Sequence, residues 1–296
     1  MAEAIKLIQR LLCKEINNSC RAAQYLRDVG ELVQTWRADA GQAAIAKHGA
    51  RRLVNSLMEA DALGFVTLLL AEQLESDKIL LAKLEKCFNG PLQTEDEVGK
   101  RSIEARNFFF EMRLLGQLTY AKLPAVSGEA PDVQTAIVGK PVLIECKRAF
   151  SRNNLTSLTR KAREQLDREL EANPEAVGFI AFDFTRILPD DRWYVSYSTR
   201  QELNVRLKDV QGYIRKYFEP DIVNALRNKV HERAVGLIEY FQTAGHNKST
   251  GCWGTTWGQE FVPLRDASPT GIVAEFSRLV KEANAVHHAS PGADEG

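Results

Sequence analysis

The segment from Pro131 to Phe150, PDVQTAIVGKPVLIECKRAF, carries two acids and a lysine within a largely apolar stretch. Asp132 stands at its head, and Glu145 and Lys147 stand near its end. Burying such groups unpaired would cost several kcal/mol for each group. Their types and spacing therefore indicate that they pair with one another or with a ligand.

Two carboxylates, a main-chain carbonyl and waters form the hard oxygen site that Mg²⁺ or Mn²⁺ prefers. A lysine beside such a site can orient or deprotonate a water. A metal ion held there can activate the water and neutralise charge that develops on phosphoryl oxygens. This combination indicates attack on a phosphodiester bond.

Two β-rich segments, DVQTAIV and PVLIECKRAF, are separated by a turn at Gly139 and Lys140 and predict a hairpin. Because side chains alternate along a strand, Glu145 and Lys147 point to the same face. Asp132 begins the first strand, opposite the end of the second. The hairpin is therefore expected to bring all three ionisable groups together.

The surrounding patterns predict a helix over residues 101–121 before the hairpin and a second helix after it. The second helix is capped near Asn154 or Thr156 and stops at Pro174. A continuous apolar run, VGFIAFDFTRIL, then predicts a strand buried on both faces. The predicted order is helix, hairpin, helix, strand.

Pro131-Asp132 followed by Glu145-Cys146-Lys147 resembles the motif of the PD-(D/E)xK nuclease superfamily. The resemblance implies an α/β fold of the restriction-endonuclease-like type, a mixed central sheet flanked by helices in the order helix, three strands, helix, strand. The first of those strands would have to lie within residues 117–126. The resemblance also implies that Asp132 and Glu145 bind the metal, that the Cys146 carbonyl is a further ligand, and that Lys147 is the catalytic lysine.

Many members add a glutamate from the preceding helix, which matches Glu111, with Glu104 two turns earlier as the alternative. Related nucleases also place a glutamine on the helix after the lysine strand, and Gln165 fits that position. Other readings stay open. Glu111 could be an ordinary acid on the helix surface. Glu145 and Lys147 could form a solvated pair on an edge strand, and Asp132 could cap a turn after proline.

Basic residues exceed acidic ones between positions 140 and 168, which suggests phosphate contacts beside the metal site. The candidates for nucleic-acid binding there are Arg148, Arg152, Arg160 and Arg163. A second candidate segment, GHNKSTGCWGTTWG, places His246 and Lys248 near Trp253 and Trp257. These residues could bind nucleic acid by stacking and phosphate contact, or the tryptophans could pack against the sheet as core.

The organisation predicted for the whole chain is a helical accessory region at 1–92, a nuclease-like domain at 93–286 and a disordered tail at 287–296. Three or four helices are expected in the first region. In the later part of the nuclease-like domain, the sequence predicts two helices broken at Glu219 and Pro220. Two strands around the glycine-rich segment 245–254 and a closing helix are predicted after them.

Composition limits the classes of partner and location. The chain has 296 residues, of which 44% are hydrophobic and 26% are charged, as in an ordinary folded protein. Its formal net charge is +0, so a polyanion must be recognised by a local patch of positive charge. Five scattered cysteines without a CxxC pair argue against a disulfide framework or zinc knuckle and favour the cytoplasm. The longest apolar run is far shorter than the roughly 20 residues that span a bilayer.

The sequence thus predicts a cytoplasmic, Mg²⁺- or Mn²⁺-dependent endonuclease acting on DNA, in restriction, mobile-element defence or repair. The N-terminal helices would serve recognition, regulation, or assembly as a homo-oligomer or with a partner protein. Two alternatives are a catalytically inactive module that keeps the fold and binds nucleic acid or a partner, and a plain α/β interaction protein with no metal site.

Overall fold

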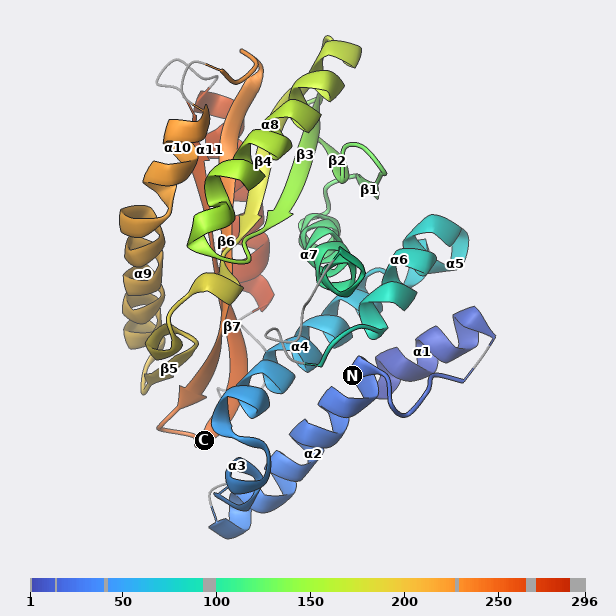
Figure 1. Ribbon diagram of the computed structural model, residues 1–296, viewed down its shortest axis with the longest axis vertical. Helices are drawn as coiled ribbons and strands as arrows, with labels where there is room; N and C mark the ends of the chain where they lie inside the picture. The colour runs from blue at the N-terminus through green and yellow to red at the C-terminus, as the bar shows by residue number, and fades with distance from the viewer. Residues whose placement is uncertain are drawn as a thin grey trace.

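A computed structural model describes residues 2–13, 15–39, 42–92, 100–226, 229–264 and 270–287. It is a mixed α/β structure in which helices pack around one central sheet (Figure 1). The mixed α/β class predicted from the sequence is therefore confirmed. The predicted boundary between residues 92 and 93 and nearly all of the predicted tail, 288–296, lie outside the described residues.

The helices are α1 (Ala2–Leu12), α2 (Arg21–Asp39), α3 (Gln42–His48), α4 (Ala50–Leu69), α5 (Ala71–Ser76), α6 (Lys78–Phe88), α7 (Lys100–Tyr120), α8 (Leu155–Ala172), α9 (Arg200–Tyr217), α10 (Glu219–Leu226) and α11 (Thr270–His287). The strands are β1 (Ala125–Ser127), β2 (Val133–Ile137), β3 (Lys140–Arg148), β4 (Val177–Asp183), β5 (Tyr194–Tyr197), β6 (Ala234–Asn247) and β7 (Cys252–Pro263). Short 3₁₀ turns precede α8 and β5.

The sheet combines antiparallel and parallel pairing. β1, β2 and β3 form an antiparallel meander, and β3, β4 and β6 run parallel to one another. The long strand β6 pairs in parallel first with β4 and then with β5 along one edge, and antiparallel with β7 along the other. The sequence predicts the order helix, hairpin, helix, strand, and α7, the β2–β3 hairpin, α8 and β4 follow in that order, with β1 added before the hairpin.

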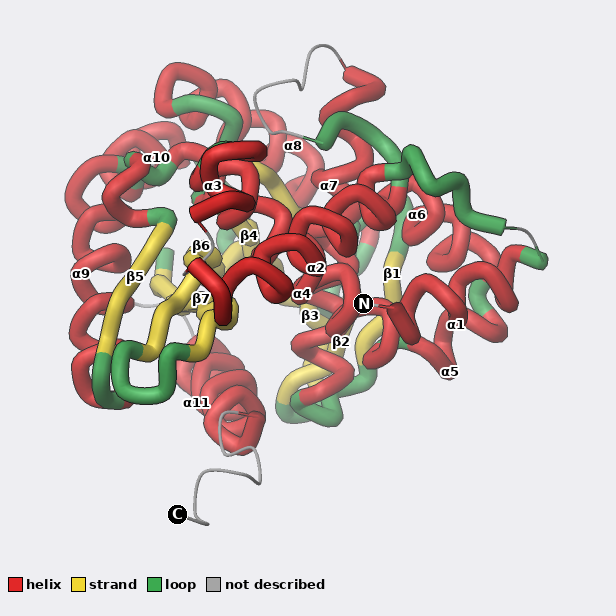
Figure 2. The backbone as a smooth tube through the Cα atoms, turned by 90° about the horizontal axis from the view of Figure 1, so that it is seen from below, coloured by secondary structure: helices red, strands yellow, loops and turns green. Residues whose placement is uncertain are grey.

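Each face of the sheet has its own hydrophobic core. Helices α8, α9 and α10 cover one face, where Leu143 of β3 packs with Leu166 of α8. Helices α7 and α11 cover the other face, where Ile144 and Cys146 pack. Seen from below, the strands lie inside a surround of helices (Figure 2). Because both faces are covered, β4 is buried at every position, as its continuous apolar sequence requires.

The hairpin of β2 and β3 turns through Val138 and Gly139. Both residues have positive φ, 51° and 74°, which is the geometry of a two-residue turn that matches the twist of the strands. Glycine adopts this conformation without a steric penalty, whereas Val138 adopts it at a cost. The turn fixes the register, and the pairing of Val133 with Ile144 follows from it.

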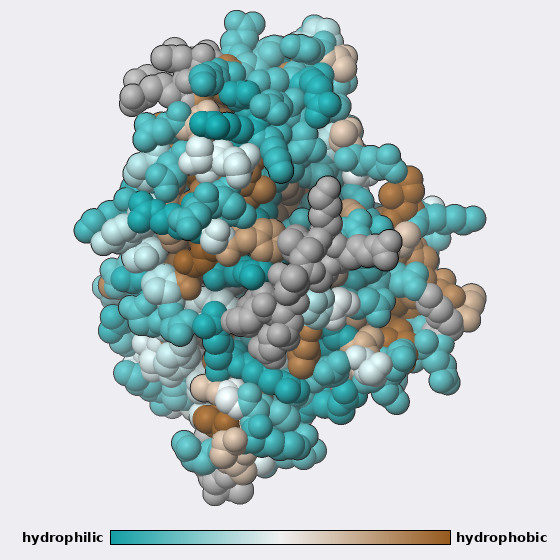
Figure 3. Space-filling view, viewed as in Figure 1, coloured by the Kyte–Doolittle hydropathy of each residue, from teal (hydrophilic) through white to brown (hydrophobic). Residues whose placement is uncertain are grey.

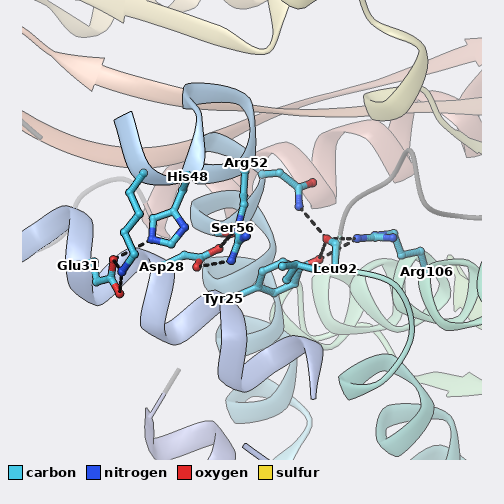
Figure 4. Close-up of polar contacts among 10 residues, drawn as sticks. Tyr25, Asp28, Glu31, His48, Arg52, Ser56, Leu92 and Arg106 are labelled. Carbon is cyan, nitrogen blue, oxygen red and sulfur yellow. Dashed lines mark hydrogen bonds and ion pairs between the residues drawn. The ribbon is translucent and has the colours of Figure 1, made fainter. Parts of the chain in front are cut away.

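The N-terminal helices pack directly on the rest of the molecule. Residues of α1, α4 and α6 belong to the same hydrophobic core as α7 and the sheet. Polar contacts add to this, because Arg106 of α7 donates to the Tyr25 hydroxyl of α2 at 2.7 Å, while Arg52 of α4 pairs with Asp28 of α2 (Figure 4). The helices up to Phe88 are thus attached to the sheet by apolar and polar contacts alike.

Several boundaries differ from those predicted. Within the described part of the N-terminal region there are six helices rather than the three or four predicted, because long apolar stretches are interrupted at points such as Leu70 and Asp77. The first strand is only Ala125–Ser127, since α7 continues to Tyr120. Strand β5 was not predicted, and its four residues pair only with the far end of β6.

The segment predicted as a glycine-rich loop between two strands is mostly strand. β6 extends to Asn247 and β7 begins at Cys252, so only a tight turn separates them. The face in Figure 3 is mainly hydrophilic, with apolar residues in small separate groups. Across the described ranges, no helix has the length and apolar character needed to cross a bilayer.

Candidate active site

The two acids of the predicted motif meet at the end of the hairpin. Because Val133 pairs with Ile144, Asp132 comes opposite Glu145 in the next register position. The Asp132 carboxylate accepts a hydrogen bond from the Cys146 backbone N–H at 2.7 Å and also lies within hydrogen-bonding reach of the Glu145 carboxyl. The two carboxyls are therefore adjacent rather than on opposite sides of the sheet.

Lys147 completes this group. Its ammonium donates to Glu145 and to the Cys146 carbonyl, the latter at 3.1 Å, and lies 3.9 Å from Asp132. The side chain of Lys147 is 15% exposed, whereas Glu145 is fully buried. The hairpin thus brings together the three ionisable groups that the sequence predicts to converge.

Glu111 is buried in the middle of α7 and lies close enough to Asp132 for the two charges to interact. Its carboxylate accepts a hydrogen bond from Lys83 of α6 at 3.0 Å. The same ammonium donates to the Ser127 hydroxyl at 3.0 Å and to the Gly128 carbonyl at 2.7 Å. All three protons of a buried lysine are therefore satisfied beside the proposed site.

Lys83 was not predicted from the sequence. It belongs to an amphipathic helix that is separated from the hairpin by more than one element. Its spacing of three from Leu80 and four from Cys87 places it on the apolar face of α6, and this spacing is the one local signal that it is buried.

Burial raises the pKa of the acids at this site. Burial and then the charge of Asp132 raise the pKa of Glu145 to about 7 and that of Glu111 to about 8. The pKa of Asp132 is also raised, mainly by burial. Burial lowers the pKa of Lys147, but the charges of Glu145 and Asp132 outweigh it and the net pKa is raised. Lys147 is thus an ammonium near neutral pH.

The donor chemistry of the site fits a hard divalent cation. Asp132, Glu145 and the Cys146 carbonyl offer only oxygen, and one buried oxygen of Glu145, Oε2, has no hydrogen-bond partner among the described residues. No group of three or more His, Cys, Asp or Glu side chains in the described ranges has a metal-binding arrangement. In the structure, Lys147 pairs with Glu145 and Lys83 pairs with Glu111.

Two further predicted residues stand apart from this group. Gln165 is half-buried on α8, and no hydrogen bond joins it to the acids of the site in the described structure. Glu104, the alternative to Glu111, is exposed and pairs with Lys86 at 3.5 Å. The structure thus brings Glu111, rather than Glu104, to the hairpin, and a role for Gln165 stays a prediction.

The predicted nucleic-acid contacts are distributed widely. Arg148 is buried and lies 3.8 Å from Asp183, so it is an internal ion pair rather than a surface cation. Arg152 is exposed and pairs with Asp221, and Arg163 is half-buried beside Asp167. Arg160 on α8 and Lys248 at the turn before β7 are exposed. These contacts with nucleic acid stay predictions.

The two tryptophans of the predicted stacking segment have different surroundings. Trp257 is partly buried and packs near Phe65 of α4, with ring centroids 6.1 Å apart. Trp253 stacks on His246 and lies edge-on to Trp36 at 5.2 Å. Trp253 borders a cavity near the start of α4, and Trp257 lines a different, smaller one.

Replacing Lys83 by methionine is expected to destabilise the protein by about 1–3 kcal/mol near neutral pH, because Glu111 loses its hydrogen-bond donor inside the core. The loss should grow above about pH 8, since the folded state must then ionise Glu111 without a cation. Urea denaturation over a range of pH measures both effects.

The matched control is Lys86→Met on the exposed side of α6, which should change stability by less than about 0.5 kcal/mol. In a Lys83→Met, Glu111→Gln double variant, the additional loss above about pH 8 should disappear. An additional loss that persists in the double variant would show that Lys83 acts on the fold independently of Glu111.

No protein-family model matches this chain. Comparison with curated proteins and with solved structures likewise yields no match. The function proposed for the chain therefore depends on the geometry and chemistry of its own residues.

Proposed function

We propose that this protein is a Mg²⁺- or Mn²⁺-dependent endonuclease of the PD-(D/E)xK type, with a restriction-endonuclease-like core, that hydrolyses phosphodiester bonds in DNA. The observation that carries the proposal is the convergence of Asp132, Glu145 and Lys147 at one end of the hairpin. The element order from α7 to β4 and the place of Glu111 beside Asp132 support it.

Asp132 and Glu145 would hold the ion, with the Cys146 carbonyl as a further ligand. When bound, the ion supplies activation of the attacking water and neutralisation of charge on the phosphoryl oxygens. Lys147 is an ammonium and acts as a hydrogen-bond donor, which orients the water or a phosphoryl oxygen. The backbone N–H of Cys146 holds the Asp132 carboxylate in place for this task.

Glu111 would act from α7 as a further acidic group of the same site. Its bond to Lys83 fixes its orientation and neutralises part of the negative charge that the buried acids collect. In this proposal the N-terminal helices therefore contribute to the site through α6, in addition to any recognition, regulatory or assembly role. The cell compartment in which such an enzyme would act on DNA is the cytoplasm.

A second candidate function is an inactive module that keeps the fold and binds nucleic acid or a partner protein. The observation that favours it is that two lysines, Lys83 and Lys147, already neutralise the buried acids. Such a site is stable without a metal ion. The two candidates differ in whether divalent metal gives turnover.

The deciding experiment measures cleavage of plasmid DNA, single-stranded DNA and RNA by the full chain with Mg²⁺, with Mn²⁺ and with a chelator. We expect cleavage of DNA that requires the metal and stops on chelation. Cleavage of RNA alone would retain the chemistry and reject DNA as the substrate. Absence of metal-dependent cleavage of all three substrates would reject the nuclease and leave the inactive module.

A further inference from the structure

A cavity of about 410 Å³ lies away from the acidic site, between the start of α4, the 3₁₀ turn before β5, and β7. This volume is within the range of small-molecule sites, roughly 300–1,000 Å³, and far exceeds the space of one water. We call it the aromatic pocket. Its lining includes Arg51, Val54, Asp190, Trp193, Tyr194 and Trp253.

The walls of the aromatic pocket are aromatic rings held in fixed positions. Tyr194 and Trp253 lie with ring centroids 5.2 Å apart. Trp253 is supported from behind by His246, stacked at 4.9 Å, and by Trp36. The indole N–H of Trp193 donates to the Leu188 carbonyl at 3.1 Å, which fixes that ring too. Rigid rings of this kind favour a flat ligand that stacks on them.

The pocket also has a polar edge. The Arg51 guanidinium lies 4.8 Å from the centroid of Trp193 and pairs with Asp190 at 3.0 Å. The pocket thus combines π faces with one hydrogen-bonding guanidinium and one carboxylate at its edge.

A flat ring with polar atoms on its edge matches this lining, and a nucleobase is such a ring. An aliphatic ligand would neither stack on the rings nor bond to Arg51 and Asp190 at the edge. A sugar would require many more polar partners than Arg51 and Asp190 provide, because Val54 and the aromatic rings form most of the wall. The chemistry therefore favours a nucleobase over both.

Trp193 also lines a second, much smaller cavity beside the aromatic pocket. Three arginines of that cavity, Arg106, Arg113 and Arg148, are buried and pair with Glu59, Tyr240 and Asp183. The charged layer beneath the aromatic pocket is therefore satisfied internally, and a ligand is recognised by the pocket itself.

We propose that the aromatic pocket binds a nucleobase, carried either by a free mononucleotide or by an unpaired nucleotide of the DNA on which the proposed nuclease acts. The second source rests on the proposed nuclease function, and the first does not. Base stacking on an aromatic wall contributes enough binding to be measured by substitution of one ring.

The test uses the full chain carrying Asp132→Asn, with chelator present, so that binding is measured without cleavage. The probes are AMP and GMP, a labelled single-stranded DNA of about ten nucleotides, and an abasic oligonucleotide of the same length. Three of the four tryptophans lie at or beside the pocket, so quenching of their fluorescence reports base binding. Anisotropy of the label reports binding of the oligonucleotide.

We expect the base-bearing oligonucleotide to bind at least about 5-fold more tightly than the abasic one, which keeps the phosphates but offers nothing to stack. Tyr194→Ala should remove most of this difference, whereas Tyr194→Phe should retain it because the ring remains. Ala50→Phe fills the pocket from an exposed position and should also remove the difference without removing a buried side chain.

Binding of AMP or GMP without a base effect in the oligonucleotide would assign the pocket to a free mononucleotide. The proposal is overturned if neither mononucleotide binds and the abasic oligonucleotide binds as tightly as the base-bearing one, or if Tyr194→Ala and Ala50→Phe leave binding unchanged. Cleavage by the wild-type chain is measured separately, so base binding without cleavage would reject the nuclease and keep the pocket.

Discussion

Asp132→Asn is expected to lower the rate constant of metal-dependent DNA cleavage by at least about 100-fold. Asparagine keeps an oxygen that can accept the hydrogen bond from the Cys146 N–H, at 2.7 Å in the wild-type chain, so the hairpin should remain intact. The substitution removes the negative charge that a metal ion requires. Activity should therefore fall without loss of fold.

Lys147→Met is expected to lower the same rate constant by about 10²–10⁴-fold, because it removes the ammonium while keeping an unbranched stem. The Glu145 carboxyl, whose pKa is already raised to about 7, can then take up a proton in place of the ion pair. The matched control is Lys140→Met, an exposed lysine at the other end of the same strand, which should retain wild-type activity.

Single-turnover cleavage, Mn²⁺ binding by calorimetry and urea denaturation together check these expectations. Asp132→Asn should weaken Mn²⁺ binding, whereas Lys147→Met should lower the rate with Mn²⁺ still bound. If both variants cleave as fast as Lys140→Met while remaining folded, the acidic site is not where the chemistry occurs.

Glu239→Gln is expected to remove a large pH dependence of stability. Glu239 of β6 is fully buried and accepts a hydrogen bond from Gln211 of α9 at 2.5 Å. Burial, followed by the charges of Glu219 and Glu260, raises its pKa to about 8. Glu260 stands directly opposite Glu239 on β7.

The sign follows from proton binding. Between the ordinary pKa of 4.5 and about 8, the folded state keeps a proton on Glu239 that the unfolded state has lost. The free energy of unfolding therefore falls as pH rises through this window, by up to about 5 kcal/mol in total. Below about pH 4.5 both states are protonated and the contribution is fully present.

Glutamine is neutral at every pH and can accept the same hydrogen bond from Gln211. Near pH 4.5 the variant should be up to about 1–2 kcal/mol less stable than the wild-type chain, because its amide group lacks a partner where Oε1 of Glu239 lies. Above pH 8 it should be about 2–4 kcal/mol more stable than the wild-type chain, because it has no buried carboxyl to ionise. Urea denaturation at intervals across this range measures the crossing. Glu175→Gln, at an exposed loop position, is the control, and it should leave the slope unchanged.

Equal slopes for Glu239→Gln and the wild-type chain would mean that Glu239 is ionised in the folded state at neutral pH. Such a result would require a cation at Glu239 that Arg215 does not supply, since Arg215 pairs with Glu260 and Glu219.

Local pattern was sufficient for the elements that carry the candidate site. The helix of Glu111, the hairpin with its turn at Gly139, the helix after it and the buried strand β4 all follow from periodicity and turn residues. The convergence of Asp132, Glu145 and Lys147 follows as well, because strand alternation and a two-residue turn determine which side chains face one another.

Other features depend on contacts between distant parts of the chain. Lys83 reaches Glu111 only because α6 packs on α7, and β5 is a strand only because the end of β6 offers it an edge. Arg148 directly follows Lys147 in sequence, yet tertiary packing buries it against Asp183.

By itself, the sequence determined the α/β class and the three charged residues that meet at the hairpin, since both depend on neighbours within a few residues. The tertiary structure decided which charges are buried, which cation neutralises each acid, and which cavity each of Trp253 and Trp257 lines. The physical reason is that burial and long-range pairing depend on which elements pack together, and no local period encodes that choice.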